Sequence, residues 1–93
     1  MYMLITYDIN VTSNKGQSRL RKVAKICVNY GQRVQNSVFE GEITEGNLKK
    51  LKIELGNKMN KDEDSLIIYT LSKNKYINKE IIGFEKNKPT VFF

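Results

Sequence analysis

The chain has 93 residues, a formal net charge of +6 and a pI near 9.5, with 40% hydrophobic and 28% charged residues. This length fits one domain, and the ordinary hydrophobic and charged fractions exclude a disordered chain. The sequence has no histidine and one cysteine, which excludes an internal disulfide and any Ser–His or Cys–His nucleophilic site. No apolar stretch approaches the ~20 residues of a membrane-spanning helix, so we expect a soluble, cytoplasmic protein with no membrane contact.

The first predicted elements are a strand and a helix. The nearly continuous apolar run Met1–Tyr7 is typical of a central strand buried on at least one face. Residues 9–16 form a loop whose Ser and Asn side chains are candidate helix caps. From about Gln17 to Tyr30 the apolar spacing predicts an amphipathic helix, which we expect Gly31 to end in a left-handed conformation. The apolar positions are Leu20, Val23, Ala24, Cys27 and Tyr30.

The middle of the chain predicts more β structure and a second helix. The β-prone segment Gln32–Ile43 is either one long bent strand or two short strands that turn at Asn36 and Ser37. Thr44 and Glu45 then open a second helix. Its apolar positions are Leu48, Leu51, Leu55 and Met59.

The last third of the chain completes the fold prediction. A polar break at Asn60–Asp64 precedes the strongly apolar strand Ser65–Leu71, and Lys79–Phe84 is a candidate further strand. The element order predicts an α+β, ferredoxin-like βαββαβ sandwich: an antiparallel sheet with two helices on one face, plus a C-terminal strand. We therefore expect a ferredoxin-like domain at 1–84 and a tail at 85–93 whose apolar end docks on its own sheet edge, a partner protomer or a partner protein.

The distribution of charge is uneven between Asp8 and Glu40. No acidic residue lies between these two, and all three arginines of the chain lie there. Because the planar arginine side chain suits bidentate phosphate contacts, this segment predicts nucleic-acid binding. Its basic residues are Lys15, Arg19, Arg21, Lys22, Lys25 and Arg33.

Asp8 is the best candidate for chemistry. A carboxylate just past a buried strand is well placed to hold Mg²⁺ against a phosphate, although it could instead cap a turn or the helix. Glu40, Glu42 and Asp64 have no telling spacing as further ligands. Since one carboxylate holds Mg²⁺ poorly, the simplest partner for Asp8 is a second Asp8 across a two-fold axis, which predicts a homodimer.

Three other candidates each have a structural alternative. Arg19 and Arg21 point to different faces of their helix, and both could be solvated surface residues. Arg33 could form an ion pair with either glutamate of the following segment. Phe39 is either an exposed residue that stacks on bases or a buried residue of a two-sided sheet, and the buried alternative is favoured.

Four short segments together carry a family resemblance. They are Tyr7-Asp8-Ile9, Arg19-Leu20-Arg21, the stretch RVQNSVFEG at 33–41 and the stretch DSLIIY at 64–69. In this order and spacing they resemble the CRISPR-associated family-two adaptation proteins (Cas-two), and the resemblance covers residues 1 to about 84.

The resemblance implies a ferredoxin-like homodimer with the Asp8 pair near the two-fold axis. It implies a Mg²⁺-dependent endonuclease that cleaves phosphodiester bonds of single-stranded RNA or double-stranded DNA, with Asp8 as the metal ligand. It also implies a central adaptor for the CRISPR integrase subunit (Cas-one) that holds spacer DNA, with the C-terminal strand crossing to a partner. The catalytic residues carried over are Tyr7, Asp8, Arg19, Arg21, Arg33, Ser37 and Phe39.

Two alternatives to this adaptation endonuclease stay open. The protein could be a non-catalytic adaptor that binds duplex backbone through its basic segment. It could also be a toxin-like messenger RNA endoribonuclease, which fold analogy alone supports.

Overall fold

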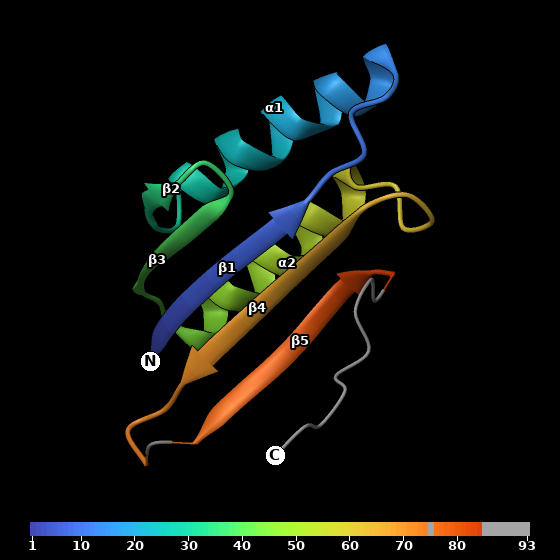
Figure 1. The fold of residues 1–93 in the computed structure, drawn as a ribbon. Coiled ribbons are helices and arrows are strands. Elements are labelled where there is room, and N and C mark those ends of the chain that lie inside the picture. The colour runs from blue at the N-terminus through green and yellow to red at the C-terminus, as the bar shows by residue number, and fades with distance from the viewer. Residues whose placement is uncertain (75, 85–93) are drawn as a thin grey trace, which may run out of the picture.

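The computed structural model describes residues 1–74 and 76–84. Five strands form one antiparallel sheet in the order β2-β3-β1-β4-β5, and two helices lie behind it in the view of Figure 1. The elements are β1 (Tyr2–Asp8), α1 (Asn14–Val28), β2 (Gln32–Gln35), β3 (Val38–Glu42), α2 (Glu45–Lys58), β4 (Ser65–Leu71) and β5 (Ile77–Gly83). The predicted ferredoxin-like α+β fold is confirmed.

The hydrophobic core lies between the helices and one face of the sheet. Along β1 the side chains alternate, and Met3, Ile5 and Tyr7 are buried against the helices. Cys27, one of the predicted apolar positions of the first helix, is fully buried, and this burial raises the pKa of its thiol to about 12 and keeps it protonated. The helical residues of the core are Val23, Cys27, Leu48, Leu51 and Leu55.

The segment 32–43 folds as the second of the two predicted alternatives. Strands β2 and β3 form a hairpin that turns at Asn36 and Ser37, and Gln35 pairs with Val38. The next helix, α2, begins as predicted, because the Thr44 hydroxyl accepts a hydrogen bond from the backbone N–H of Asn47.

Helix α1 differs from its prediction at both ends. It begins earlier, at Asn14, because the Ser13 hydroxyl accepts a hydrogen bond from the backbone N–H of Gly16. The prediction of a left-handed Gly31 is wrong: among the described residues the positive-φ glycine is Gly83. Gly31 instead passes close to β3, where a Cβ would lie 3.0 Å from the Glu40 carbonyl oxygen.

Strand β5 pairs with β4 along its whole length, from Ile77 opposite Leu71 to Gly83 opposite Ser65. It begins two residues before the predicted Lys79. The predicted tail, 85–93, lies outside the described residues. Within 1–74 and 76–84, neither helix has the length and apolar character needed to cross a membrane.

Two of the helical glycines, Gly16 and Gly56, provide a matched test of the loop that follows β1. A Cβ on Gly16 would lie 1.9 Å from the Asn10 carbonyl oxygen, whereas a Cβ on Gly56 would meet nothing within 4 Å. We expect Gly16→Ala to lower the free energy of unfolding by at least about 1 kcal/mol, and Gly56→Ala to raise it by about 0.5–1 kcal/mol. Urea unfolding at one fixed protein concentration measures both; a gain in stability for Gly16→Ala would contradict the contact.

Candidate functional site

Asp8 ends the central strand, on the face of the sheet that neither α1 nor α2 covers. It is exposed and pairs with Ser65 of β4. Because strand side chains alternate, Asp8 shares this open face with Tyr2, Leu4 and Thr6. The structure thus gives Asp8 an accessible carboxylate at a strand end, as the sequence predicted.

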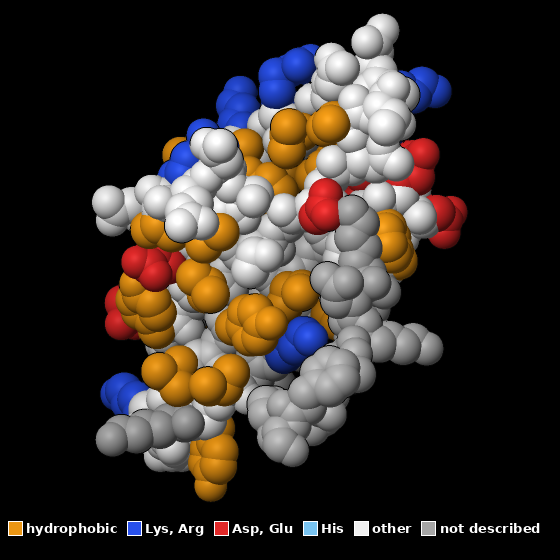
Figure 2. Space-filling model, in the orientation of Figure 1, with side chains coloured by type: hydrophobic (Ala, Val, Ile, Leu, Met, Phe, Trp, Pro, Cys, Tyr) orange, Lys and Arg blue, Asp and Glu red, His pale blue; other side chains and the backbone are white. Residues whose placement is uncertain are grey.

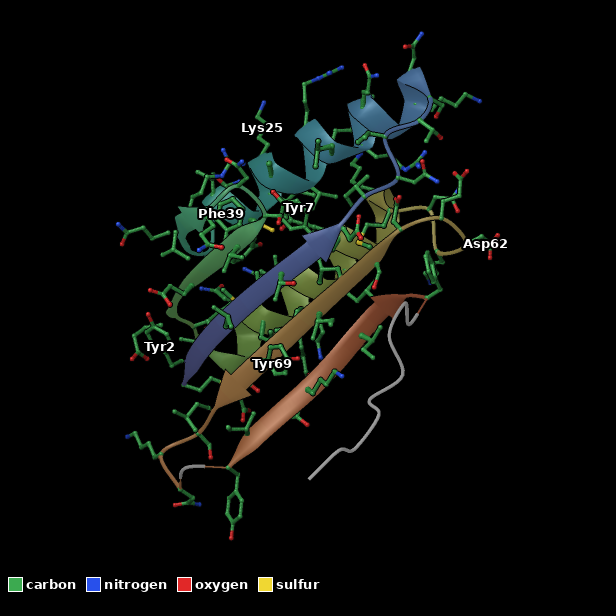
Figure 3. The ribbon with its side chains drawn as sticks, in the orientation of Figure 1. Tyr2, Tyr7, Lys25, Phe39, Asp62 and Tyr69 are labelled. Atoms are coloured by element: carbon green, nitrogen blue, oxygen red, sulfur yellow. The ribbon has the colours of Figure 1, made fainter. Side chains whose placement is uncertain are left out.

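Tyr7, the residue before Asp8, forms a cluster with the β2–β3 hairpin on the opposite face of the sheet from the Asp8 side chain. The Tyr7 hydroxyl donates to the Asn36 carbonyl oxygen at 3.2 Å, and its backbone N–H donates to the Ser37 carbonyl oxygen at 3.1 Å. The Tyr7 and Phe39 rings stack at 6.1 Å between centroids (Figure 3), and the Arg33 guanidinium lies 5.0 Å from the centre of the Phe39 ring. Burial raises the pKa of Tyr7, although its hydrogen bond with Arg33 opposes the rise.

This cluster decides two of the alternatives left by the sequence. Phe39 is fully buried, so it supports Tyr7 and Arg33 from within the core and offers no ring for stacking on bases. Arg33 is exposed above that ring, and within the described residues no ion pair joins it to Glu40 or Glu42. An exposed guanidinium that is held over a buried ring is suited to a phosphate contact.

Arg19 has a protein partner that sequence reasoning missed. Its Nε donates to Asp64 Oδ2 at 2.8 Å and its Nη2 to Asp64 Oδ1 at 3.3 Å, with a further contact to Glu63 at 3.3 Å. The Asp64 side chain is 0% exposed and the Arg19 side chain 14%. As the two-residue spacing predicts, Arg19 and Arg21 lie on different faces of α1, and Arg21 is exposed to solvent. Arg19 is therefore committed to a structural pair before any substrate arrives.

The Asp64 carboxylate joins three segments of the chain. Besides Arg19 of α1, it accepts hydrogen bonds from the backbone N–H of Asn10 at 3.1 Å and of Asn60 at 2.9 Å. Burial opposes ionisation of Asp64, but these bonds and the Arg19 charge outweigh it and lower its pKa. In the sequence, Asp64 is an acid directly before a strongly apolar strand. An exposed acid of an ordinary polar loop would have the same position, so the sequence does not indicate its burial.

The other basic residues of α1 lie on the outer surface of this helix. Lys15, Arg21, Lys22 and Lys25 are all exposed, and Figure 2 shows basic side chains in a row along this helix. A groove of about 230 Å³ runs between the helices. It is lined by Lys22, Lys25, Ile26, Asn29 and Lys58. Three ammonium groups around one groove give it a positive potential that attracts anions.

A single protomer offers little to a metal ion. Within the described residues, no group of three or more His, Cys, Asp or Glu side chains could hold one. Mg²⁺ keeps several waters and needs one or two carboxylates plus substrate phosphate oxygens, so an exposed Asp8 fits as one ligand of a shared site. The donor set therefore fits Mg²⁺ when a second carboxylate comes from outside the protomer.

The centre of the open face is apolar, while Glu40 and Glu42 of β3 and Lys79 of β5 share this face on either side of it. Figure 2 shows hydrophobic side chains gathered over the strands on this face, and Figure 3 shows Tyr2 and Tyr69 among them. A hollow of about 350 Å³ lies at the end of the face away from Asp8. It is lined by Tyr2, Leu4, Tyr69, Thr70, Leu71 and Ile77. Ile77 is 72% exposed, which is unusual for a residue of this size on a strand.

Comparison with known proteins identifies the family. Residues 1–79 match the family described as CRISPR associated protein Cas2. The chain is 52% identical over 83 residues to a CRISPR-associated endonuclease Cas2 of Halalkalibacterium halodurans, covering 89% of this chain and 86% of that protein. It is 42% identical over 88 residues to a CRISPR-associated endoribonuclease Cas2 of Dictyoglomus turgidum, covering 95% and 94%. The crystal structure of Streptococcus pyogenes Cas2 at pH 6.5 superposes with a TM-score of 0.72 and 47% identity, covering 80% of this chain and 89% of that one.

The Asp64–Arg19 pair predicts a pH-dependent loss of stability. We expect Asp64→Asn to lower the free energy of unfolding by about 3 kcal/mol at neutral pH, because it leaves Arg19 without its buried partner. The folded-state pKa of Asp64 is below its ordinary value of 3.8. Its contribution is therefore present above that value and is lost as the pH falls through the folded-state pKa. The difference from the unsubstituted protein should be constant above about pH 5 and shrink below pH 3.8.

Glu63→Gln is the matched control for this prediction. The Glu63 side chain is 48% exposed, so its bond to Arg19 is screened by solvent. Urea unfolding across the pH range should show a loss of no more than about 1 kcal/mol for Glu63→Gln. Equal losses for the two variants would contradict the central role of Asp64.

Proposed function

Because the chain belongs to the CRISPR-associated Cas2 family, we propose that it is a homodimeric, Mg²⁺-dependent endonuclease that also serves as an adaptor in CRISPR adaptation. Its relatives carry the names endonuclease and endoribonuclease, which support a nuclease role and leave RNA and DNA both as substrates. The observation that carries the proposal is the exposed Asp8 carboxylate at the end of β1, on an apolar sheet face.

A second copy of the chain is the proposed occupant of the open face. Large side chains such as Tyr2, Leu71 and Ile77 are exposed there at 40%, 42% and 72%. A protein of 93 residues gains considerably from covering such a surface. If a two-fold axis passes near Asp8, the dimer brings two Asp8 carboxylates together, which supplies the second ligand that one protomer lacks.

The proposed reaction is hydrolysis of a phosphodiester bond. Bound Mg²⁺ would neutralise charge on the phosphate and lower the pKa of a bound water. Asp8 would hold the ion. Arg33 lies with Phe39 on the opposite face of the sheet, so it would bind a neighbouring phosphate of the nucleic acid. Tyr7 and Ser37 fix the hairpin that carries Arg33, since Tyr7 bonds to the backbone of the turn at 36–37. Phe39 supports the same guanidinium from below.

The basic surface of α1 is the proposed nucleic-acid contact. Lys15, Arg21, Lys22 and Lys25 would bind phosphate groups without reading base sequence. In a dimer that covers the open faces, this surface stays accessible because it lies on the helical side of the sheet. Such a surface would let the dimer hold spacer DNA for the CRISPR integrase subunit (Cas-one), the proposed protein partner.

The second candidate function is a non-catalytic adaptor. The groove that joins Lys22 and Lys25 of α1 to Lys58 of α2 favours it, because it binds backbone whether or not Asp8 acts on a phosphate. The two functions are compatible in one protein, and separate substitutions distinguish them.

Substitution of Asp8 tests the nuclease. We expect Asp8→Asn to reduce cleavage of single-stranded RNA and double-stranded DNA in Mg²⁺ by at least about 100-fold, since it removes the ligand charge. Dimer mass and nucleic-acid affinity should stay unchanged. Asp62→Asn is the matched control, because Asp62 lies in the α2–β4 loop and projects away from the body (Figure 3). Cleavage that survives in Asp8→Asn would show that Asp8 does not hold the catalytic ion and would remove the proposed site.

Mixed dimers test whether the two Asp8 residues act together. When unsubstituted and Asp8→Asn chains are unfolded together, refolded in equal amounts and assayed, a shared site predicts about one quarter of full activity. Independent sites predict about one half. A linear dependence on the fraction of unsubstituted chain would therefore exclude the paired site while leaving the role of Asp8 intact.

Substitution of the groove lysines tests the nucleic-acid contact. Replacing Lys22, Lys25 and Lys58 with Gln should reduce the slope of log affinity against log salt by about 2–3 for duplex DNA, because each lost phosphate contact removes about 0.9. The same change at Lys49, Lys50 and Lys73, which are also exposed, keeps the net charge equal and should leave the slope unchanged. Equal effects of the two triple variants would show that only net charge matters.

A further inference from the structure

The loop that leaves β1 is held by the only described acid with no exposed surface. Asp64 is 0% exposed, and its Oδ1 accepts a hydrogen bond from the backbone N–H of Asn10 at 3.1 Å. Asn10 lies two residues beyond Asp8, where the chain has already left the sheet. The position of the chain after Asp8 therefore depends on this bond rather than on strand pairing.

Further contacts fix the same loop. The Asn10 side chain accepts hydrogen bonds from the Thr12 backbone N–H at 3.0 Å and from the Thr12 hydroxyl at 2.8 Å. The Asn10 carbonyl lies against Gly16, at the start of α1. The loop is thus attached on one side to α1 and on the other to Asp64.

Asp64 is itself fixed with respect to Asp8. The residue after it, Ser65, pairs directly with Asp8 across the two central strands. The backbone carbonyl of Asp64 accepts a hydrogen bond from the Phe84 N–H at 3.2 Å. Gly83 passes so close that a Cβ there would lie 2.1 Å from the same oxygen. The Asp64 backbone is therefore fixed beside Asp8, and its carboxylate supports the chain just after Asp8.

Arg19 supplies the charge that makes this support possible. A buried carboxylate is costly unless it is paired and fully hydrogen-bonded. Arg19 bonds to both oxygens of Asp64, from Nε at 2.8 Å and from Nη2 at 3.3 Å. The backbone N–H of Asn60 adds a bond at 2.9 Å. With four bonds, the carboxylate keeps its charge inside the protein.

We propose that Asp64 and Arg19 are positioning residues: the pair holds Asn10, and through it sets the direction of the Asp8 carboxylate. Arg19 then acts on the site through Asp64 and does not contact the substrate. The catalytic part of this inference rests on the proposed role of Asp8 as the metal ligand. A misplacement of a reacting group by about 1 Å can reduce a rate 100-fold, so such a pair matters to turnover as well as to folding.

The first experiment separates positioning from substrate contact by kinetics. Asp64→Asn and Arg19→Gln should each lower kcat by about tenfold or more and leave KM within about twofold. Because the two residues act as a unit, the double variant should be no slower than the slower single variant. Glu63→Gln, which removes the exposed contact of Arg19, should leave both constants unchanged. All rates are expressed per folded dimer.

The second experiment measures the local stability of the loop and needs no cleavage assay. Amide hydrogen exchange followed by NMR should accelerate at Asn10 and Asn60 in both Asp64→Asn and Arg19→Gln, while Ile5 in the centre of β1 stays protected. If Asp64→Asn fails to fold, Arg19→Gln carries the test, since its side chain is partly exposed. Acceleration that appears equally at Ile5 would mean general loss of stability and would overturn the inference.

Other outcomes separate this inference from the proposed function. A raised KM in Arg19→Gln, with an effect that adds to that of Asp64→Asn, would mean that Arg19 contacts substrate and would overturn the inference. Unchanged kcat in both variants would also overturn it. If Asp8→Asn cleaves normally, the role of Asp8 as the metal ligand fails, whereas selective exchange at Asn10 would still establish that the pair holds the loop.

Discussion

The Asp64 carboxylate is the interaction on which the arrangement of this protein depends. It lies at one end of the sheet, where β1 finishes and β4 begins, and it bonds to the β1–α1 loop, to α1 and to the α2–β4 loop. Asn10 and Arg19 lie 54 and 45 residues before Asp64 in the sequence, so the carboxylate joins distant parts of the chain. A neutral side chain of the same shape could not satisfy an arginine and two backbone N–H groups at once. The charge is thus what joins the helical layer to the end of the sheet.

A second constraint follows from covering only one face of the sheet. Both helices pack on Met3, Ile5 and Tyr7, so the alternate side chains of β1, including Asp8, face away from the core. The apolar residues of that open face and the carboxylate at its end therefore belong to one surface. A surface of this composition suits association with a second copy, and the same association would complete a two-carboxylate site. Stability and chemistry then depend on the same interface.

Much of the fold and part of the site could be predicted from the sequence, for reasons that differ between residues. The stripe of leucines in α2 and the cap at Thr44 are local signals, and both are confirmed. Asp8 was found because it directly follows an apolar strand. Arg19 and Phe39 were grouped with it through a family resemblance, yet Arg19 bonds to Asp64 and Phe39 lies in the core. A resemblance indicates that a residue matters, and its contacts decide how.

The sequence by itself determined the element order, the basic character of α1 and the isolation of Asp8 from other acids, because each is a property of neighbouring residues. Only the tertiary structure decided the partner of Arg19, which is 45 residues away in the chain. It also decided that Asp64 is buried, since a polar run such as 60–64 reads the same whether its acids face water or an arginine. Burial and charge pairing between distant segments depend on how the sheet and helices close on one another, and no local pattern records that.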